Sequence, residues 1–110
     1  MNRATEVVAE DLEPLLTLFR ILSDRTRLNL LMILARGERN VSSLCDELRL
    51  PQPTVSHHLG LLRRSNLITS HRDGRQVFYQ LKAGLEALSG EGLEFTAAPF
   101  VVRIGEAAGA

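Results

Sequence analysis

The sequence lacks several features that other small proteins depend on. It has one cysteine among 110 residues, no tryptophan, 5% aromatic residues and a formal net charge of zero. A single cysteine excludes a framework of internal disulfides and fits a reducing cytoplasm. No apolar run approaches the roughly 20 residues that cross a bilayer, and the acidic start of the chain lacks the apolar core of a secretion signal. We therefore expect a cytoplasmic protein without a membrane partner.

Motifs typical of enzymes are also missing. The sequence has no glycine-rich phosphate loop, no nucleophile paired with a base and no carboxylate cluster suited to a cleft. It therefore predicts a protein that is not an enzyme. Hydrophobic residues make up 45% of the chain, which is enough for one small folded domain. Because so few of them are aromatic, the core is limited, and we expect a second copy of the chain to complete it.

Charge is unevenly distributed along the chain although its sum is zero. Residues 49–82 hold six basic residues, one acidic residue and all three histidines. The rest of the chain holds seven basic and twelve acidic residues. A basic middle in an acidic frame indicates that a polyanion binds on one side of the molecule. Chance scatter in a short chain is the simpler alternative.

Apolar spacing predicts two helices at the start of the chain. They cover residues 11–22 and 25–36, with Ser23 as the cap of the second helix and Gly37 at its end. An extended connector around Val41 is expected to follow. The residues predicted to face the core from the second helix are Leu28, Leu31, Met32 and Ala35.

A second pair of helices, joined by a short turn, is expected next. The first begins at Ser42 or Ser43 and ends at Leu48. The second has Pro53 in its first turn and reaches Arg64 or the residue after it.

Two extended runs, residues 67–72 and 75–81, follow the helices and are joined by Asp73 and Gly74, a pair typical of hairpin turns. A last helix is expected over residues 83–89. Two helices joined by a short turn and followed by a hairpin are the order of a winged helix-turn-helix. The predicted fold is therefore mainly α (α+β), with about five helices and a two-stranded wing.

The expected organisation has two parts. Residues 1–89 form the DNA-binding and dimerisation domain, and residues 90–110 form a C-terminal tail of uncertain structure. The tail is too apolar to be dismissed as disordered, and it could cover the first helix or line an effector pocket.

The fourth predicted helix has one side for the core and another for a polar partner. Val55, Leu59 and Leu62 recur at i, i+4 and i+7, which anchors one face. The residues expected to read base edges project from the other face: Gln52, Thr54, Ser56 and His57. Basic residues at the end of this helix and on the wing are expected to contact phosphates or the minor groove: Arg63, Arg64, His71, Arg72 and Arg75. The alternatives are a solvated helix face and an ordinary charged turn.

His58 leans toward the core side of the same helix. We expect a structural histidine that is hydrogen-bonded to backbone rather than a metal ligand. The adjacent His57 points about 100° away, so the two rings cannot chelate one ion together.

Three segments together resemble the ArsR/SmtB family of bacterial winged-helix repressors. They are ILSDRTRLNLLMIL, VSSLCDELRLPQPTVSHHLGLLRRSNLI and RDGRQVFYQL, and the resemblance runs from about residue 18 to residue 81. It implies a homodimeric repressor that binds double-stranded operator DNA, places its two fourth helices in successive major grooves and is often released by an inducer. It also implies a dimer interface between the first and last helices, made here by Leu12, Leu15, Leu16, Phe19, Leu85 and Leu88.

The chain departs from this family where its sensors lie. Arsenic-responsive members carry a cysteine cluster at the start of the third helix, whereas residues 40–45 here keep only Cys45. Zinc-type members place Asp, His and Glu on the last helix, where this chain has neither His nor Cys. Pro51 also stands where the family usually has a serine that caps the recognition helix. We therefore predict no regulatory metal at these sites and no cofactor.

Cys45 and the inducer leave alternatives open. A buried, inert thiol is the first interpretation of Cys45, and a single-cysteine sensor of oxidants or persulfides is the second. The inducer is then a small molecule, a thiol-reactive species or absent. A winged helix that binds another protein instead of DNA is the rival from a different functional class.

Overall fold

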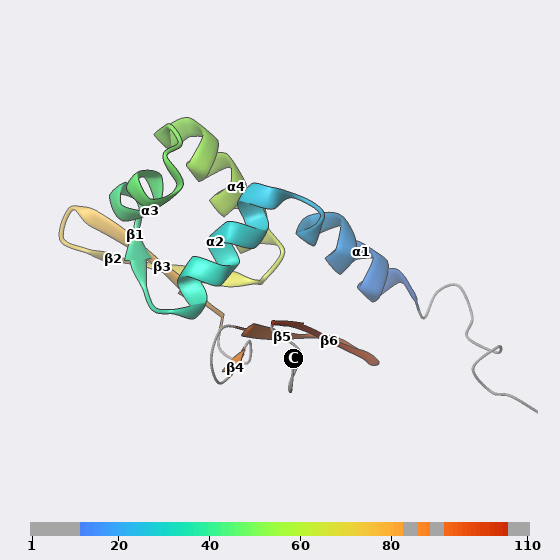
Figure 1. Ribbon diagram of the computed structural model, residues 1–110. Helices are drawn as coiled ribbons and strands as arrows, with labels where there is room; N and C mark the ends of the chain where they lie inside the picture. The colour runs from blue at the N-terminus through green and yellow to red at the C-terminus, as the bar shows by residue number, and fades with distance from the viewer. Residues whose placement is uncertain (1–11, 83–85, 89–91, 106–110) are drawn as a thin grey trace, which may run out of the picture.

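The computed structural model describes residues 12–82, 86–88 and 92–105. The elements follow in the order α1 (Glu13–Leu22), α2 (Arg25–Ala35), β1 (Arg39–Asn40), α3 (Val41–Leu48), α4 (Gln52–Arg64), β2 (Ile68–Asp73), β3 (Gln76–Leu81), β4 (Glu86–Leu88), β5 (Gly92–Ala97) and β6 (Phe100–Gly105). The strands form two three-stranded sheets, ordered β1-β3-β2 and β4-β5-β6. Figure 1 shows the β2–β3 hairpin projecting at one end of the molecule and α1 at the other. The predicted winged helix is confirmed.

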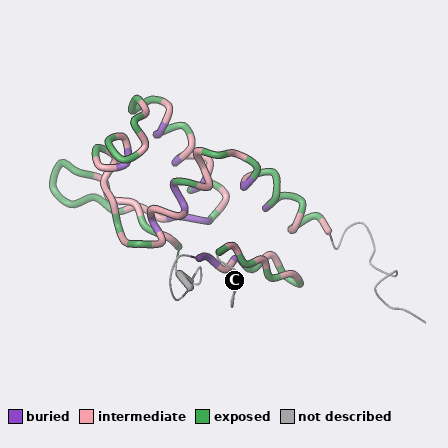
Figure 2. The backbone as a smooth tube through the Cα atoms, in the orientation of Figure 1, coloured by how far each residue is buried: buried purple, intermediate pink, exposed green. Residues whose placement is uncertain are grey.

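One hydrophobic core joins the helices to both sheets. The inner sides of all four described helices are buried, and their outer sides and the tip of the hairpin are exposed (Figure 2). The core residues are Leu18, Leu22, Leu30, Leu31, Leu34, Leu44, Val55, Leu59, Leu62, Leu67, Ile68, Leu93 and Phe95. Among the described helices, none is long and apolar enough to span a bilayer.

The start of α2 differs from the prediction by one residue. The N-cap is Asp24, whose Oδ1 accepts the backbone N–H of Arg27 at 3.0 Å. Ser23 instead closes α1, because its Oγ donates to the carbonyl of Arg20 at 3.0 Å. The sequence alone did not identify the right cap, because serine and aspartate are both preferred at the N-cap of a helix. Gly37 follows the helix with a φ of +148°, a positive value that glycine adopts more easily than other residues.

The inward face of α2 was predicted only in part. Leu31 is fully buried as expected, but the other fully buried or nearly buried residues are Leu30 and Leu34. Leu28, Met32 and Ala35 are only half-buried. The physical reason is that α2 is covered from more than one side, since it packs against α1, α4, β3 and β5.

The third helix begins one or two residues earlier than predicted. Val41 is its first residue rather than part of a connector, and Asn40 is the cap. Asn40 Oδ1 accepts the backbone N–H of Ser43 at 2.8 Å, so neither Ser42 nor Ser43 has the capping role. The two residues before the helix form β1, which pairs with β3.

The hairpin turn is also shifted by one residue. Asp73 pairs with Gln76, so Gly74 and Arg75 form the two-residue loop instead of Asp73 and Gly74. Gly74 has a φ of +65°, which suits glycine at the first position of such a loop. The shift places Arg75 at the tip of the wing.

The largest departure from the sequence prediction lies near the C-terminus. Instead of a helix over residues 83–89, the described part of this segment is the strand β4. It starts a β4-β5-β6 sheet that packs through β5 against α1 and α2. Leu93 and Phe95 of β5 are each 1% exposed. A part of the presumed tail therefore covers the first helix, one of the two roles suggested for it.

Candidate nucleic-acid interface

The helix α4 is held in the core by the three residues that the sequence predicted. Val55, Leu59 and Leu62 each have 0% exposure. Its N-cap, Pro51, makes no side-chain hydrogen bond, because a proline side chain has no donor or acceptor. The Pro51 carbonyl accepts the N–H groups of Thr54 and Val55 at 3.1 and 3.2 Å, which begins the helix without a polar cap. The orientation of α4 about its own axis is thereby fixed.

The predicted base-reading residues lie outside the fully buried face of α4. Gln52, Ser56 and His57 are exposed, and Thr54 is half-buried. These side chains offer hydrogen-bond donors and acceptors at the N-terminal half of the helix. This is the part of a recognition helix that reaches base edges in a major groove.

The two arginines at the end of α4 are both exposed. Arg63 Nη1 donates to Ser70 Oγ of β2 at 3.3 Å, so this end of α4 is tied to the wing. Arg64 lies one residue further along the helix. Both positions are compatible with contacts to the phosphates that flank a groove.

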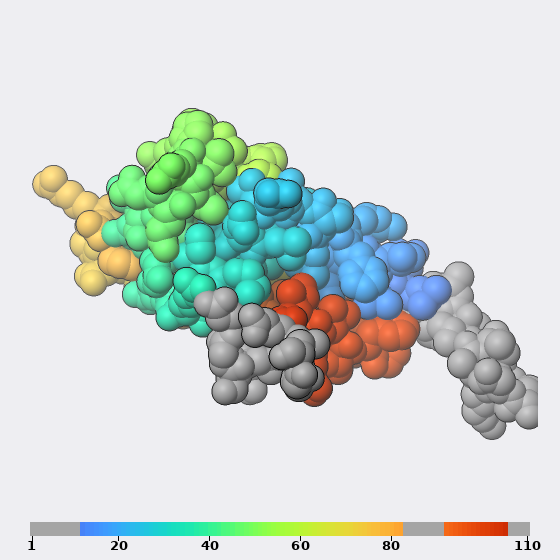
Figure 3. Space-filling model, in the orientation of Figure 1, coloured from blue at the N-terminus to red at the C-terminus, as the bar shows by residue number. Residues whose placement is uncertain are grey.

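The wing carries the remaining predicted contacts. His71, Arg72 and Arg75 are all exposed. The His71 ring stacks on Phe78 with centroids 5.7 Å apart, and its Nε2 lies 3.6 Å from a carboxylate oxygen of Glu38. Figure 3 shows the tip of the wing projecting beyond the helical body.

A hollow of about 260 Å³ joins the wing to the starts of α3 and α4. Gln52 of α4 and Arg75 of the wing both line it, so the fold brings together two residues predicted separately. Asn40 Nδ2 donates to Gln76 Oε1 at 3.0 Å across the same region. The full lining is Asn40, Val41, Ser42, Gln52, Arg75, Gln76 and Val77. Sequence reasoning missed Asn40 and Gln76, because their pairing depends on the approach of β1 to β3.

His58 lies in a polar contact between helices, which corrects the expected bond to backbone. Its Nδ1 is 3.3 Å from Arg27 Nη1 and 4.0 Å from Asp24 Oδ1. The physical reason is that α4 packs on the start of α2, where these two charged side chains stand. The backbone N–H of Arg27 is the main cause that lowers the pKa of the Asp24 carboxyl. Burial opposes this effect, while the charge of Arg27, and that of His58 whenever its ring is protonated, lower the pKa further.

Cys45 lies on α3, half-buried against the hydrophobic core. Among the residues that the structure describes, no group of three or more His, Cys, Asp or Glu side chains is placed to hold a metal ion. The inert and the redox interpretations of this thiol both stay predictions.

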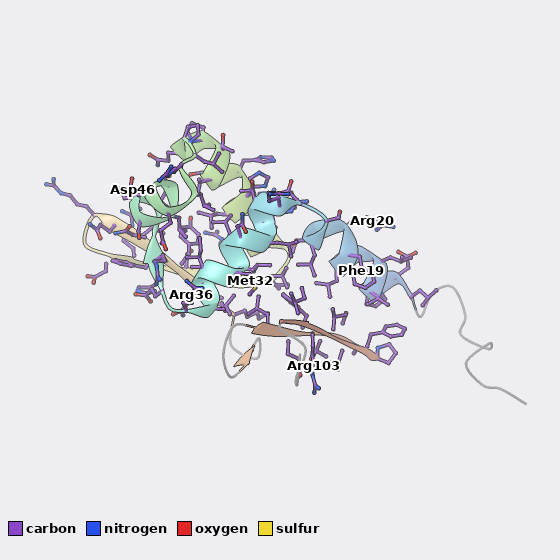
Figure 4. All side chains as sticks on the ribbon, in the orientation of Figure 1. Phe19, Arg20, Met32, Arg36, Asp46 and Arg103 are labelled. Atoms are coloured by element: carbon purple, nitrogen blue, oxygen red, sulfur yellow. The ribbon has the colours of Figure 1, made fainter. Side chains whose placement is uncertain are left out.

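The residues predicted for the dimer interface fall into three groups. Leu12 and Leu15 are half-buried, whereas Leu16 and Phe19 are 41% and 46% exposed on α1. Leu88 belongs to the strand β4 instead of a helix, and Leu85 lies outside the described residues. Figure 4 shows Phe19 on α1, at the end of the molecule remote from the wing.

Comparison with known proteins agrees with this architecture. Residues 24–70 match the family described as "Bacterial regulatory protein, arsR family". The crystal structure of the transcriptional repressor BigR from Xylella fastidiosa superposes with a TM-score of 0.66 and 32% identity, covering 76% of this chain and 84% of that one. The chain belongs to the ArsR family. The resemblance that the sequence segments indicated is thus confirmed.

Two curated ArsR-type relatives give the extent of the similarity. The HTH-type transcriptional regulator KmtR of Mycobacterium tuberculosis is 42% identical over 64 residues, which are 58% of this chain and 49% of that protein. The arsenical resistance operon repressor of Escherichia coli is 42% identical over 71 residues, 64% of this chain and 61% of that protein. The chain thus spans about half to three fifths of the length of these two relatives.

Proposed function

We propose that this ArsR-family protein is a homodimeric transcriptional repressor that binds operator DNA through α4 and the wing. The observation that carries the proposal is the hollow between them, which Gln52 and Arg75 line together. A base-reading helix and a basic hairpin are the two parts with which winged-helix proteins hold a duplex.

The charge of this region supports a polyanionic partner. Arg63, Arg64, Arg72 and Arg75 are exposed on α4 and the wing, and the acidic residue of this segment, Asp73, stands at the base of the wing turn. Cations so placed release counterions from DNA when they meet phosphates, which makes binding dependent on salt. A protein-binding winged helix does not require this dependence.

The homodimer is proposed because operator recognition by this fold uses two copies of α4. Exposed Leu16 and Phe19 give α1 an apolar side at the end of the molecule away from the wing. Contact between two copies at this end leaves both wings at the outer ends of the assembly. The inducer stays a prediction, and no described group of side chains favours one chemical class.

Titration of the protein with a duplex from its own promoter region tests the proposal. We expect His57→Ala to weaken binding by about a hundredfold, because the homodimer loses one base contact in each subunit and each such loss costs about tenfold. Arg75→Ala should weaken binding to all sequences and lower the salt slope of log K by about 2, because each subunit of the homodimer loses one phosphate contact.

Arg103→Ala is the matched control for these variants. Arg103 Nε pairs with Glu94 Oε2 on β5 at 2.6 Å, and Figure 4 shows Arg103 directed away from the helices. This variant removes a surface arginine remote from α4 and should leave the affinity unchanged. Parental affinity in both His57→Ala and Arg75→Ala, at every salt concentration, would show that this surface does not bind DNA.

A further inference from the structure

The side chain of Arg27 joins three helices. Its Nε donates to the carbonyl of Ile21 at 2.6 Å and its Nη2 to the carbonyl of Arg20 at 3.4 Å, both in the last turn of α1. Its Nη1 lies 3.3 Å from Nδ1 of His58, in the middle of α4. The side chains of Arg27 and His58 are each only 14% exposed, so water competes little for these contacts. α2 is thus connected to α1 and to α4 through one guanidinium group.

The contact between Arg27 and His58 defines the state of the imidazole. A guanidinium group has only donors, so a hydrogen bond between Arg27 Nη1 and His58 Nδ1 needs Nδ1 as the acceptor, with the ring proton on Nε2. Asp24 holds the guanidinium from the other side, with its Oδ2 3.7 Å from Arg27 Nη1. The contact therefore exists in this form only while His58 is neutral.

The position of this contact matters because α1 and α4 are connected through α2. α1 packs on α2 and β5, and α4 packs on α2, α3 and β2. In the proposed homodimer, α1 contacts the partner and α4 contacts DNA. The distance between the end of α1 and the middle of α4 then decides how far apart the two α4 helices of the dimer lie.

We propose that Arg27, acting through Nδ1 of His58, is a positioning residue that fixes α4 relative to the end of α1 and so selects the spacing of the two DNA half-sites. This inference rests on the proposed function. It assigns a role in specificity to two residues that do not touch DNA.

Replacements of His58 test the proposal without removing the bonds of Arg27 to α1. In His58→Asn, the amide oxygen takes the place of Nδ1 as an acceptor for Arg27. In His58→Leu, a side chain of similar bulk offers no acceptor. The matched pair is compared with the parent protein on operator duplexes whose half-sites are moved closer or further apart by one base pair.

We expect the parent and His58→Asn to bind the duplex with the native spacing about tenfold more tightly than the duplexes with altered spacing. This factor is small compared with the usual ratio of specific to non-specific DNA affinity. His58→Leu should bind the native operator about fivefold more weakly, the order expected for one lost hydrogen bond, and should bind all three spacings almost equally. An undiminished preference for the native spacing in His58→Leu overturns the proposal. Failure of the parent protein to bind any duplex overturns the proposed function instead.

Protonation of the imidazole gives a second readout that a merely structural role would not change. Once NMR shows that the His58 ring is protonated, Nδ1 can no longer accept, and the parent should lose its spacing preference while His58→Asn keeps it. The charged or titratable groups facing His58 are Asp24 and Arg27 of α2 and His57 of α4, whose ring lies 5.4 Å away. All three are present in His58→Asn, so they cannot cause a difference between the two proteins. A parent that keeps its preference with a protonated ring contradicts the role of Nδ1.

Discussion

Asp24 combines two stabilising roles in a single side chain. It caps α2 by accepting the N–H of Arg27, and it faces the charge of Arg27 and the imidazole ring of His58. Both roles favour the ionised carboxylate, which explains why its pKa lies below the ordinary value of 3.8. A group with a lowered pKa stabilises the folded state fully above its unfolded value and loses this contribution as the pH falls through its folded value.

A prediction about pH follows from the position of Asp24. Asp24→Asn keeps a good capping residue but removes the charge, whereas Asp24→Ala removes both and should cost about 1 kcal/mol at pH 7. The free energy of unfolding of the parent should fall toward that of Asp24→Asn as the pH drops below 3.8. Urea unfolding between neutral and acidic pH measures this. Parallel pH profiles for the two proteins would show that the carboxylate makes no contribution.

Single residues also show which details the sequence could supply. Val55, Leu59 and Leu62 were predictable, because helical spacing alone separates an anchored face from an exposed one. The partner of His58 was not predictable, because Arg27 is 31 positions earlier in the chain and reaches it only after α2 packs on α4.

Among the elements, α3 depends on one capping residue outside its own sequence. Asn40 bonds the N–H of Ser43 and also donates to Gln76 of the wing strand β3. We expect Asn40→Ala to lower the free energy of unfolding by about 1 kcal/mol, the usual cost of losing an N-cap. Asn40→Asp keeps the capping oxygen but has no donor for Gln76, so it should recover most of this loss. Chemical denaturation measures each variant.

Ser42→Ala is the control for this prediction, since Ser42 is an exposed residue inside the helix. Its free energy of unfolding should change by less than about 0.5 kcal/mol, as for most surface substitutions. A larger loss in Ser42→Ala than in Asn40→Ala would return the capping role to serine, as the sequence alone suggested.

The elements of the central segment were predictable and those of the C-terminal segment were not. Both helix pairs and the hairpin have local signals, such as periodic leucines, a proline in the first turn of α4 and a glycine in the wing loop. The segment that contains β4 has leucines at helical spacing, and this indicated a helix. β4 nevertheless pairs with β5, because the long-range packing of Leu93 and Phe95 on the helices outweighs local preference.

At the scale of the whole molecule, the exposed apolar residues give the dimer a testable location. Phe19→Glu should raise the dissociation constant of the proposed dimer by about 30-fold, the effect of losing an interface residue worth 2 kcal/mol. Sedimentation should then report a monomer at concentrations where the parent is dimeric, and operator affinity should fall as well. Val101→Glu is the control, because Val101 is 56% exposed on β6 rather than on α1. Equal dissociation by both variants would move the interface away from α1.

The strand β5 has a consequence for the synthesis of the protein. Leu93 and Phe95 complete a core whose other members begin at Leu18, so more than seventy residues of chain separate its first and last contributors. A polypeptide still emerging from the ribosome has made all four described helices before these two side chains are available. Until then, the apolar sides of α1 and α2 lack their cover, and the nascent chain is most vulnerable to aggregation and proteolysis in this interval. Translation must therefore pass Phe95 before the core closes.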